Sequence, residues 1–529
     1  MDHYEESNPK PEIVIGLCGP VGTDLRGVSE KIANDLRAYR YETDSIRVSD
    51  LLKARCEDHI KEYVEGLGED RRIDVLMNVG DHLRCETKKG AAIVPDILTE
   101  IRKRRQNFLL SEDCSNEHDR IELYNRCYII NSLKNPDEVG LLRRVYGDKF
   151  ILLSIVSPQS VRRGKLIDKI SQTHLTTEYL KFGDKADFLI EKDRQRTDIK
   201  FGQSISEAFP LADFFLRTGV NLEADVRRFL RILFGSQKET PTRLEFAMYE
   251  ARSNALRSAD LSRQVGAVVT NDKFQIVSRG CNEVPVVGGD SYWADDEGTV
   301  RDNRDVSQGR DFNAIKKIEI LRELLDFLNR ESVATLGNKS LDESVDQLVM
   351  GDLRDQFKHL RVSNLIEFGR MIHAEMAALM ESARRGLAVE GGKMIVTTFP
   401  CHMCARHIIS AGIAEVFFIE PYPKSLTAEI YRDEIAVEES EDTLNEVVEG
   451  GKRVLFKAFY GVAPRFYTKA FEMGDRKDRT GYALPFNERL ALPLSVPLSR
   501  SHLTTELAVS LTGKFIPKVT DKEKIESRL

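Results

Sequence analysis

Predominantly apolar runs in the N-terminal half of the chain predict buried strands. The first run covers residues 13–17 and leads into a Gly-rich turn and a predicted helix over residues 28–40. A second run covers residues 149–158. A third covers residues 209–217, ahead of a predicted closing helix over residues 221–234. Because a strand covered on both faces has no exposed side, such runs are typical of parallel sheets. We therefore expect a three-layer α/β/α domain in this half.

The C-terminal half alternates helical and strand patterns. An opening helix starts at Arg243, and a turn followed by a strand covers residues 262–269. A helix over residues 371–385 and a strand over residues 393–398 come later. They lead into a strand-helix-strand unit, whose helix covers residues 401–411 and whose next strand covers residues 414–419. Residues 454–467 read as a strand and a turn that could add to the same sheet. A second α/β domain is therefore expected.

A long segment over residues 286–370 interrupts this second pattern. Residues 288–311 are rich in Gly, Asp and Ser and contain Trp293, the only Trp of the chain. We expect a surface loop anchored by Trp293, with a lid over a ligand as the alternative. An apolar stripe at helical spacing follows, which core packing or an oligomer contact explains. Its members are Ile315, Ile318, Leu321, Leu324, Leu325 and Leu328.

These patterns divide the chain into domains. We expect a polar tail over residues 1–12, an N-terminal domain over 13–235 and a C-terminal domain over 243–475 that includes the insertion 286–370. The residues between the two domains, 236–242, are Ser-Gln-Lys-Glu-Thr-Pro-Thr, a composition typical of a linker. Residues 476–529 form a C-terminal extension.

The amino-acid composition limits the classes of function that the chain can have. The chain has 529 residues, a net charge of −7 and 41% hydrophobic residues, which suits a globular protein of two or three domains. The negative charge argues against a broadly basic nucleic-acid binder, although a local patch could still bind RNA. No apolar run approaches the roughly 18 residues of a membrane helix. The polar N-terminus is unlike a signal peptide, and eight scattered Cys favour the reducing cytoplasm.

Two short motifs supply the parts of a zinc site. The first is His373-Ala374-Glu375, and the second is Pro400-Cys401-His402-Met403-Cys404. One imidazole and two thiolates bind zinc and leave a fourth position for water, which is the arrangement in hydrolytic nucleobase deaminases. Cys401 and Cys404 share a face at the start of a helix, where the helix dipole favours thiolates. A redox pair, or a structural zinc site completed by His402 or His407, is the alternative.

The expected roles follow from this chemistry. Zinc held by His373, Cys401 and Cys404 would lower the pKa of a bound water towards neutrality. Glu375 is not needed for coordination, so it is placed to take the proton of the water and pass it to the ring nitrogen. Attack at the amino-bearing carbon and loss of ammonia would complete the reaction.

With these motifs, residues 243–425 resemble the cytidine and deoxycytidylate deaminase superfamily. The segment Gly280-Cys281-Asn282-Glu283-Val284-Pro285 is similar to one in deoxycytidylate deaminases whose Asn hydrogen-bonds the sugar. The resemblance implies an α/β/α fold with a mixed sheet and one zinc ion per chain, because the insertion 286–370 has no Cys. It implies a substrate contact by Asn282. We also expect Arg263 to contact the substrate, and Tyr422, just after the last core strand, to line the pocket, with simple surface placement as the equal alternative for Tyr422. The His-Ala-Glu motif also occurs in tRNA-adenosine, riboflavin-pathway and polynucleotide deaminases.

The Gly-rich turn near the N-terminus resembles a degenerate P-loop. Gly16 lies near the end of the predicted strand, and Gly19, Gly22 and Thr23 lie between it and the predicted helix, where backbone N–H groups can hold phosphates. Leu25 and Arg26 replace the Lys and Ser/Thr of an active kinase loop. Four arginines, Arg162, Arg163, Arg194 and Arg196, recur where nucleotide kinases bind phosphate, and a solvated basic helix face is the equal alternative. A kinase-like domain that senses a nucleotide or receives a partner is expected.

A degenerate P-loop domain ahead of a deaminase resembles the anti-phage deoxycytidine nucleotide deaminases of bacteria. That resemblance implies conversion of dCMP or dCTP to uracil nucleotides, depletion of the pool that a phage needs, and inhibition by a small noncoding RNA. It also implies a homo-oligomer. An RNA or single-stranded DNA deaminase, or an inactive nucleotide or RNA sensor, is the alternative.

Overall fold

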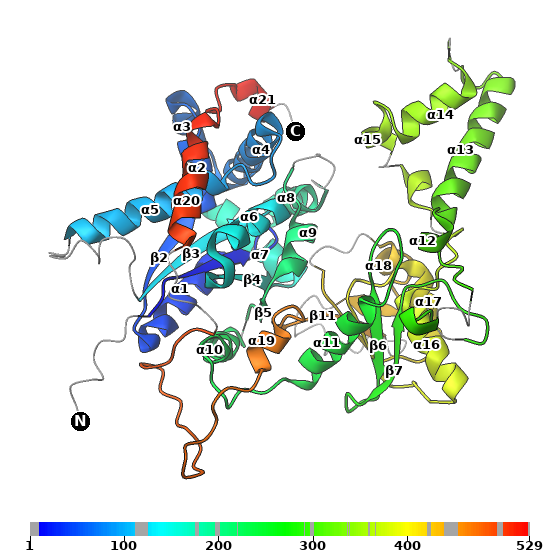
Figure 1. Ribbon diagram of the computed structural model, residues 1–529. Coiled ribbons are helices and arrows are strands. Elements are labelled where there is room, and N and C mark those ends of the chain that lie inside the picture. Colours follow the sequence, from blue (N-terminus) through cyan, green and yellow to red (C-terminus); the bar gives the residue numbers. More distant parts are fainter. Residues whose placement is uncertain are drawn as a thin grey trace.

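The computed structural model describes residues 10–526, except 112–124, 175–178, 196–201, 220, 290, 297–300, 336, 338, 358–359, 366, 421–424, 438–452 and 495–500. Figure 1 shows a mixed α/β architecture with two sheets, one in each half of the chain. Within the described ranges, no helix is long and apolar enough to cross a membrane.

The N-terminal sheet has six strands in the order β12-β5-β4-β1-β3-β2. Five of them pair in parallel, as the apolar runs predict, and β12 pairs antiparallel with β5. Alternate residues of β1 enter two different cores, with Val14 in one and Ile13 and Ile15 in the other. Both faces of this sheet are therefore buried. The strands are β1 (Ile13–Cys18), β2 (Glu42–Arg47), β3 (Arg126–Leu133), β4 (Phe150–Val156), β5 (Phe214–Arg217) and β12 (Gly461–Val462).

Ten α-helices of the described N-terminal half accompany this sheet. They are α1 (Leu25–Leu36), α2 (Val48–Ala54), α3 (Asp58–Glu65), α4 (Glu69–Thr87), α5 (Val94–Ser111), α6 (Pro136–Tyr146), α7 (Gln159–Thr173), α8 (Gly183–Gln195), α9 (Ile205–Ala208) and α10 (Leu222–Leu233).

Two sequence-based boundaries in this half are wrong. Helix α1 begins at Leu25 rather than Val28, because the side chain of Asp24 accepts a hydrogen bond from the Gly27 N–H and caps the helix. The strand expected over residues 209–217 begins only at Phe214. Residues 209–211 form a 3₁₀ turn with Pro210 at its start, where a residue without an N–H is tolerated.

The C-terminal sheet is mixed, with the order β10-β11-β9-β8-β6-β7. β6 is antiparallel to β7 and β8, whereas β8, β9, β11 and β10 run parallel. The strand expected after residue 454 is β11, which does join this sheet. The strands are β6 (Gly266–Thr270), β7 (Ile276–Cys281), β8 (Lys393–Val396), β9 (Glu415–Phe418), β10 (Ile435–Val437) and β11 (Val454–Ala458).

Helices α11 (Arg243–Ala255), α16 (Ala374–Arg385), α17 (His402–Ser410) and α18 (Thr427–Ile430) accompany the C-terminal sheet. Two glycines let the first two helices pack directly on it. A Cβ on Gly266 would overlap the backbone of Ala251 in α11, and a Cβ on Gly280 would overlap the backbone of Ala374 and Ala378 in α16. Glycine at these positions therefore fixes how closely α16 approaches β7.

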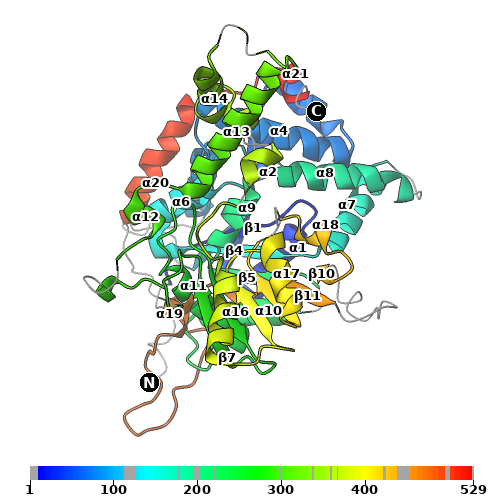
Figure 2. The same ribbon diagram turned by 90° about the vertical axis from the view of Figure 1, so that its right-hand side faces the viewer.

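The insertion forms helices α12 (Asp305–Gln308), α13 (Phe312–Arg330), α14 (Leu341–Val349) and α15 (Arg354–Phe357). Figures 1 and 2 show α13 and α14 as a pair that projects away from the C-terminal sheet. The predicted apolar stripe lies on α13. Leu321 is buried, but Ile315, Leu324 and Phe327 on the same helix are exposed. Core packing therefore explains only part of the stripe.

The last part of the chain returns to the N-terminal half. β12 extends the N-terminal sheet, and α19 (Tyr467–Phe471), α20 (Ser501–Thr512) and α21 (Lys522–Glu526) follow it. Glu506 of α20 is fully buried, where it accepts hydrogen bonds from Arg105 at 2.8 Å and from the Tyr146 hydroxyl at 2.9 Å. The C-terminal extension is thus part of the packing of the N-terminal half.

Candidate metal centre

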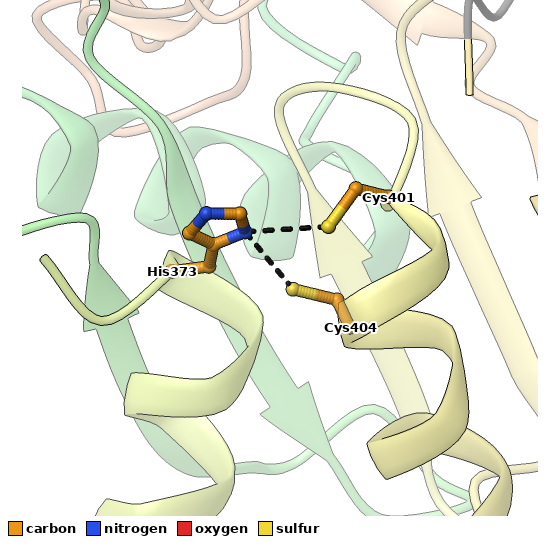
Figure 3. Close-up of side chains that lie close together, drawn as sticks. All are labelled: His373, Cys401 and Cys404. Atoms are coloured by element: carbon orange, nitrogen blue, oxygen red, sulfur yellow. Dashed lines mark hydrogen bonds between the residues drawn. The ribbon is translucent and has the colours of Figure 1, made fainter. Parts of the chain in front are cut away.

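Three predicted ligands meet at the starts of two helices of the C-terminal half. Figure 3 shows His373 at the start of α16 facing Cys401 and Cys404 at the start of α17. The His373 Nδ1 atom lies 3.3 Å from the Sγ atom of each cysteine. All three possible ligand atoms lie within 4.8 Å of one another, and no other such group of three occurs in the described ranges.

Local sequence explains why these side chains converge. His373 and Cys401 are the N-cap residues of α16 and α17, with extended backbone that turns each side chain across the helix start. Cys404 lies three residues after Cys401 and therefore on the same helix face. The loop before Cys401 is held by the Thr427 hydroxyl, which donates to the Pro400 carbonyl at 2.9 Å. The ligands thus depend on helix starts rather than on a mobile loop.

The spacing of these atoms fits a tetrahedral zinc ion. Zn–N and Zn–S bonds of about 2.0–2.3 Å separate neighbouring ligand atoms by roughly 3.5 Å. The two observed N–S separations of 3.3 Å are close to that value. One nitrogen and two sulfurs are a usual donor set for zinc. These residues can therefore hold zinc and leave one position for another ligand.

The protein favours an ionised thiol at this centre. The hydrogen bond from Cys404, with the nearby His373, lowers the pKa of Cys401 to about 4. The same hydrogen bond raises the pKa of Cys404. His373 has a raised pKa, mainly because of its hydrogen bond with Cys401. Cys401 is therefore the thiolate of the group, whereas Cys404 and His373 hold their protons more tightly. Binding of a metal cation would displace those protons.

Glu375 lies beside this group and is 4% exposed. Burial raises the pKa of its carboxyl group, and the Cys404 side chain is a hydrogen-bond partner. Buried carboxyl groups with a raised pKa are typical of residues that transfer protons in active sites. The structure therefore places a buried carboxyl group against the three candidate ligands.

The predicted substrate residues are placed differently. Asn282 is buried, and its side chain holds the turn before β6. Its Oδ1 accepts from the Val265 N–H at 2.7 Å, and its Nδ2 donates to the Arg263 carbonyl at 2.8 Å. Arg263 itself is exposed. Tyr422 lies outside the described residues. Substrate contact by these three residues stays a prediction.

Sequence reasoning gave no role to Glu283, which secures the approach to His373. Its backbone exchanges hydrogen bonds with Ile372 at 3.0 and 3.2 Å, next to His373. Its buried carboxylate accepts from the N–H groups of Ala259 and Val284. The signal in the sequence that could have pointed to Glu283 is its position directly after Asn282.

The insertion contacts the same region through Trp293. The centroid of its ring lies 3.6 Å from the guanidinium carbon of Arg257, and its side chain is 47% exposed. This contact supports a loop anchored by Trp293, and the role of the insertion stays a prediction.

The Gly-rich turn belongs to the other sheet. Gly16 lies within β1, and Gly19, Gly22 and Thr23 follow it, with Gly22 at a φ of +84°. Of the four arginines, Arg162 donates to the carbonyls of Ser157 and Val21, while Arg163 and Arg194 pair with Asp187 and Glu191. Arg196 lies outside the described residues. These pairings fit the solvated-face alternative for Arg163 and Arg194.

Comparison with known proteins gives matches in the same region. Residues 241–420 match the family model described as "Cytidine and deoxycytidylate deaminase zinc-binding region". The ComE operon protein 2 of Bacillus subtilis (strain 168) is 33% identical over 79 residues, which are 15% of this chain and 42% of that protein. The deoxycytidylate deaminase of Enterobacteria phage T4 is 43% identical over 54 residues, which are 10% of this chain and 28% of that enzyme. The chain therefore matches less than half of the length of these relatives.

Among solved structures, the dCMP deaminase of cyanophage S-TIM5 in complex with dCMP and dUMP aligns at 16% identity over 41% of this chain and 98% of its own. The TM-score is 0.21, too low to add to the argument. The family match covers all four residues of the centre. Residues 241–420 therefore carry a domain of the cytidine and deoxycytidylate deaminase family, and His373, Glu375, Cys401 and Cys404 lie within it.

Proposed function

We propose that this chain is a zinc-dependent deaminase of deoxycytidine nucleotides. The observation that carries the proposal is the convergence of His373, Cys401 and Cys404 beside the buried carboxyl group of Glu375, inside the matched deaminase region. A structural zinc site has no use for a buried, unliganded carboxyl group with a raised pKa, whereas a hydrolytic site does. A simple redox pair of cysteines would not need His373.

Bound zinc would lower the pKa of a coordinated water. Glu375 would take a proton from the water that adds to C4 of cytosine and deliver it to N3 of the ring. A second proton transfer through Glu375 would allow the amino group to leave as ammonia. Cytosine and water give uracil and ammonia, so no further reactant is required.

For the substrate, we propose dCMP, dCTP or both. The deoxycytidylate deaminases among the matched relatives support a nucleotide rather than a free base. Asn282, Arg263 and Tyr422 are the proposed nucleotide contacts. Contact through the Asn282 amide would require it to share or exchange its bond to the Arg263 carbonyl.

The proposed setting is the cytoplasm, where the enzyme would deplete deoxycytidine nucleotides during phage infection under control of a small noncoding RNA. The order of the two halves, a Gly-rich α/β half before a deaminase, supports this setting. The exposed side chains of Ile315, Leu324 and Phe327 on the projecting α13 support assembly into a homo-oligomer, which sedimentation would measure.

The test is ammonia release with product identification on cytidine, dCMP, dCTP, CTP and a cytosine-containing oligonucleotide. Wild-type protein is expected to convert dCMP or dCTP selectively. Glu375→Gln should keep its zinc and lose about 10²–10⁴-fold in kcat, whereas Cys404→Ala should lose both zinc and activity. Turnover of the oligonucleotide alone would move the assignment to polynucleotide editing. Near-normal activity of Glu375→Gln would contradict the role of this carboxylate.

A further inference from the structure

A cavity of about 270 Å³ lies in the N-terminal half, away from the deaminase sheet. It is bounded by the loop Gly19–Thr23, the start of α2, the middle of α4 and the end of β3. Figure 1 shows α2 and α4 together beyond one end of the N-terminal sheet. In open α/β sheets, ligands bind at the carboxyl ends of parallel strands, and this cavity has that position next to β1 and β3.

One wall of the cavity is apolar. Leu52 of α2 and Ile73, Leu76 and Met77 of α4 line it. Such a surface suits the flat, weakly polar ring of a nucleobase, because burying ring area against aliphatic side chains is favourable.

The charged residues that line the cavity are all cations. They are Arg26, Arg47, Arg72, Arg84, Lys134 and Lys169. Four of them pair with carboxylates, such as Glu69 for Arg72 and Asp193 for Lys134. The side chains of Arg47 and Lys169 are exposed and make no hydrogen bond or close ion pair within the described residues, although the charge of Lys169 helps to lower the pKa of Asp24. In a chain of net charge −7, a cavity whose charged lining residues are all cations, with Arg47 and Lys169 exposed at its edge, favours an anionic ligand.

Thr23 provides an independent sign of a ligand. Its side chain is 8% exposed and lines the cavity, yet its hydroxyl oxygen has no hydrogen-bond partner among the described residues. A buried hydroxyl without a partner is costly. Ser132, on the opposite side, has a φ of +82°, a conformation that is uncommon for a residue other than glycine. A ligand that accepts a hydrogen bond from Thr23 would satisfy its hydroxyl.

The loop itself is closed to a long phosphate chain. The Val21 N–H donates to the Asp193 carboxylate at 2.8 Å, and Lys134 binds the same carboxylate. Asp193 thus occupies donors that a triphosphate would need. The cavity volume of about 270 Å³ is also slightly below the range of about 300–1,000 Å³ that is usual for small-molecule sites, which favours a small ligand.

We propose that this cavity binds a nucleoside monophosphate that is not a substrate. The phosphate accepts hydrogen bonds from Thr23 and pairs with Arg47 and Lys169, and the base packs on Leu76 and Met77. This site is separate from the proposed deaminase centre and does not depend on its activity.

The test is isothermal titration of the zinc-loaded full chain with dTMP, AMP, GMP, thymidine and inorganic phosphate. None of these probes carries cytosine, so turnover does not interfere. Saturable binding of at least one nucleotide is expected. Arg47→Ala combined with Lys169→Ala should weaken it by about tenfold or more, and Leu76→Trp should abolish it by filling the cavity. Arg227→Ala, which removes an exposed, paired arginine on α10, is the matched control and should bind as wild type does.

Thr23→Val separates ligand binding from folding. Because the hydroxyl has no protein partner, this variant should keep or slightly increase the unfolding temperature while binding falls several-fold. No saturable binding of any nucleotide, or unchanged binding in both the double variant and Leu76→Trp, would overturn the proposal. Equally tight binding of inorganic phosphate and of the nucleotides would also overturn the proposal, because the base would then contribute nothing to binding through the apolar wall.

Discussion

The contact between Gly280 and α16 gives a direct test of how the fold positions the metal centre. Gly280→Ala would place a Cβ inside the van der Waals radii of the Ala374 carbonyl oxygen and the Ala378 nitrogen, and 2.9 Å from the Ala377 Cβ. The obstructing atoms belong mostly to helix backbone, so no side chain can rotate away. Helix α16 must therefore move away from β7 by roughly 1 Å to restore ordinary contact distances.

The size of the effect follows from what α16 carries. His373 is the N-cap of α16, and Glu375 lies in its first turn, so both move with the helix while Cys401 and Cys404 stay on α17. A misplacement of about 1 Å can cost 10²-fold in rate. Overpacking a core typically costs about 1–3 kcal/mol, which corresponds to about 2–4 °C in unfolding temperature for each kcal/mol in a domain of this size.

The assay compares kcat/KM for the preferred nucleotide, zinc content and unfolding temperature. Gly140→Ala is the control, because Gly140 lies in α6 with no atom within 4 Å of its added Cβ and should be neutral or slightly stabilising. We expect Gly280→Ala to lose about 10²-fold in kcat/KM, to bind zinc more weakly and to unfold several degrees earlier. Wild-type activity and full zinc content in Gly280→Ala would refute the reasoning.

Two further predictions concern buried charge. In chelator-treated protein, the pKa of about 4 for Cys401 means that its thiolate persists well below the usual range, so its alkylation rate by iodoacetamide should stay nearly flat from pH 9 to pH 5. A rate that falls tenfold per pH unit below pH 8 would show an ordinary thiol. Glu506→Ala leaves Arg105 with Glu12 alone and Tyr146 without its acceptor, which should cost about 3–5 kcal/mol in the free energy of unfolding. Chemical denaturation measures this free energy. The control is Asp326→Ala, which removes an exposed ion pair and should change the free energy of unfolding by less than about 0.5 kcal/mol. Equal losses in the two variants would contradict the buried role of Glu506.

Sequence alone was enough for the candidate metal centre, because its parts are local. His373 and Glu375 are two residues apart, and Cys401 and Cys404 are three apart on a predicted helix. Helical periodicity then fixes which side chains share a face. The strands β1, β4 and β8 were predictable for a similar reason, since an apolar run that is buried on both faces is visible in the residues themselves.

Other features exist only in the tertiary structure. β12 and α20 return to the N-terminal half from the far end of the chain, and Glu506 finds Arg105 across about 400 residues. Asn282 uses its amide to hold Arg263 and Val265, and Arg47 meets Thr23 and Lys169 around one cavity. The periodic pattern of apolar and polar residues does not predict these contacts between distant residues, because each side chain has several possible partners in the sequence. Packing of the whole chain selects one partner and leaves the hydroxyl of Thr23 without any in the part that is described.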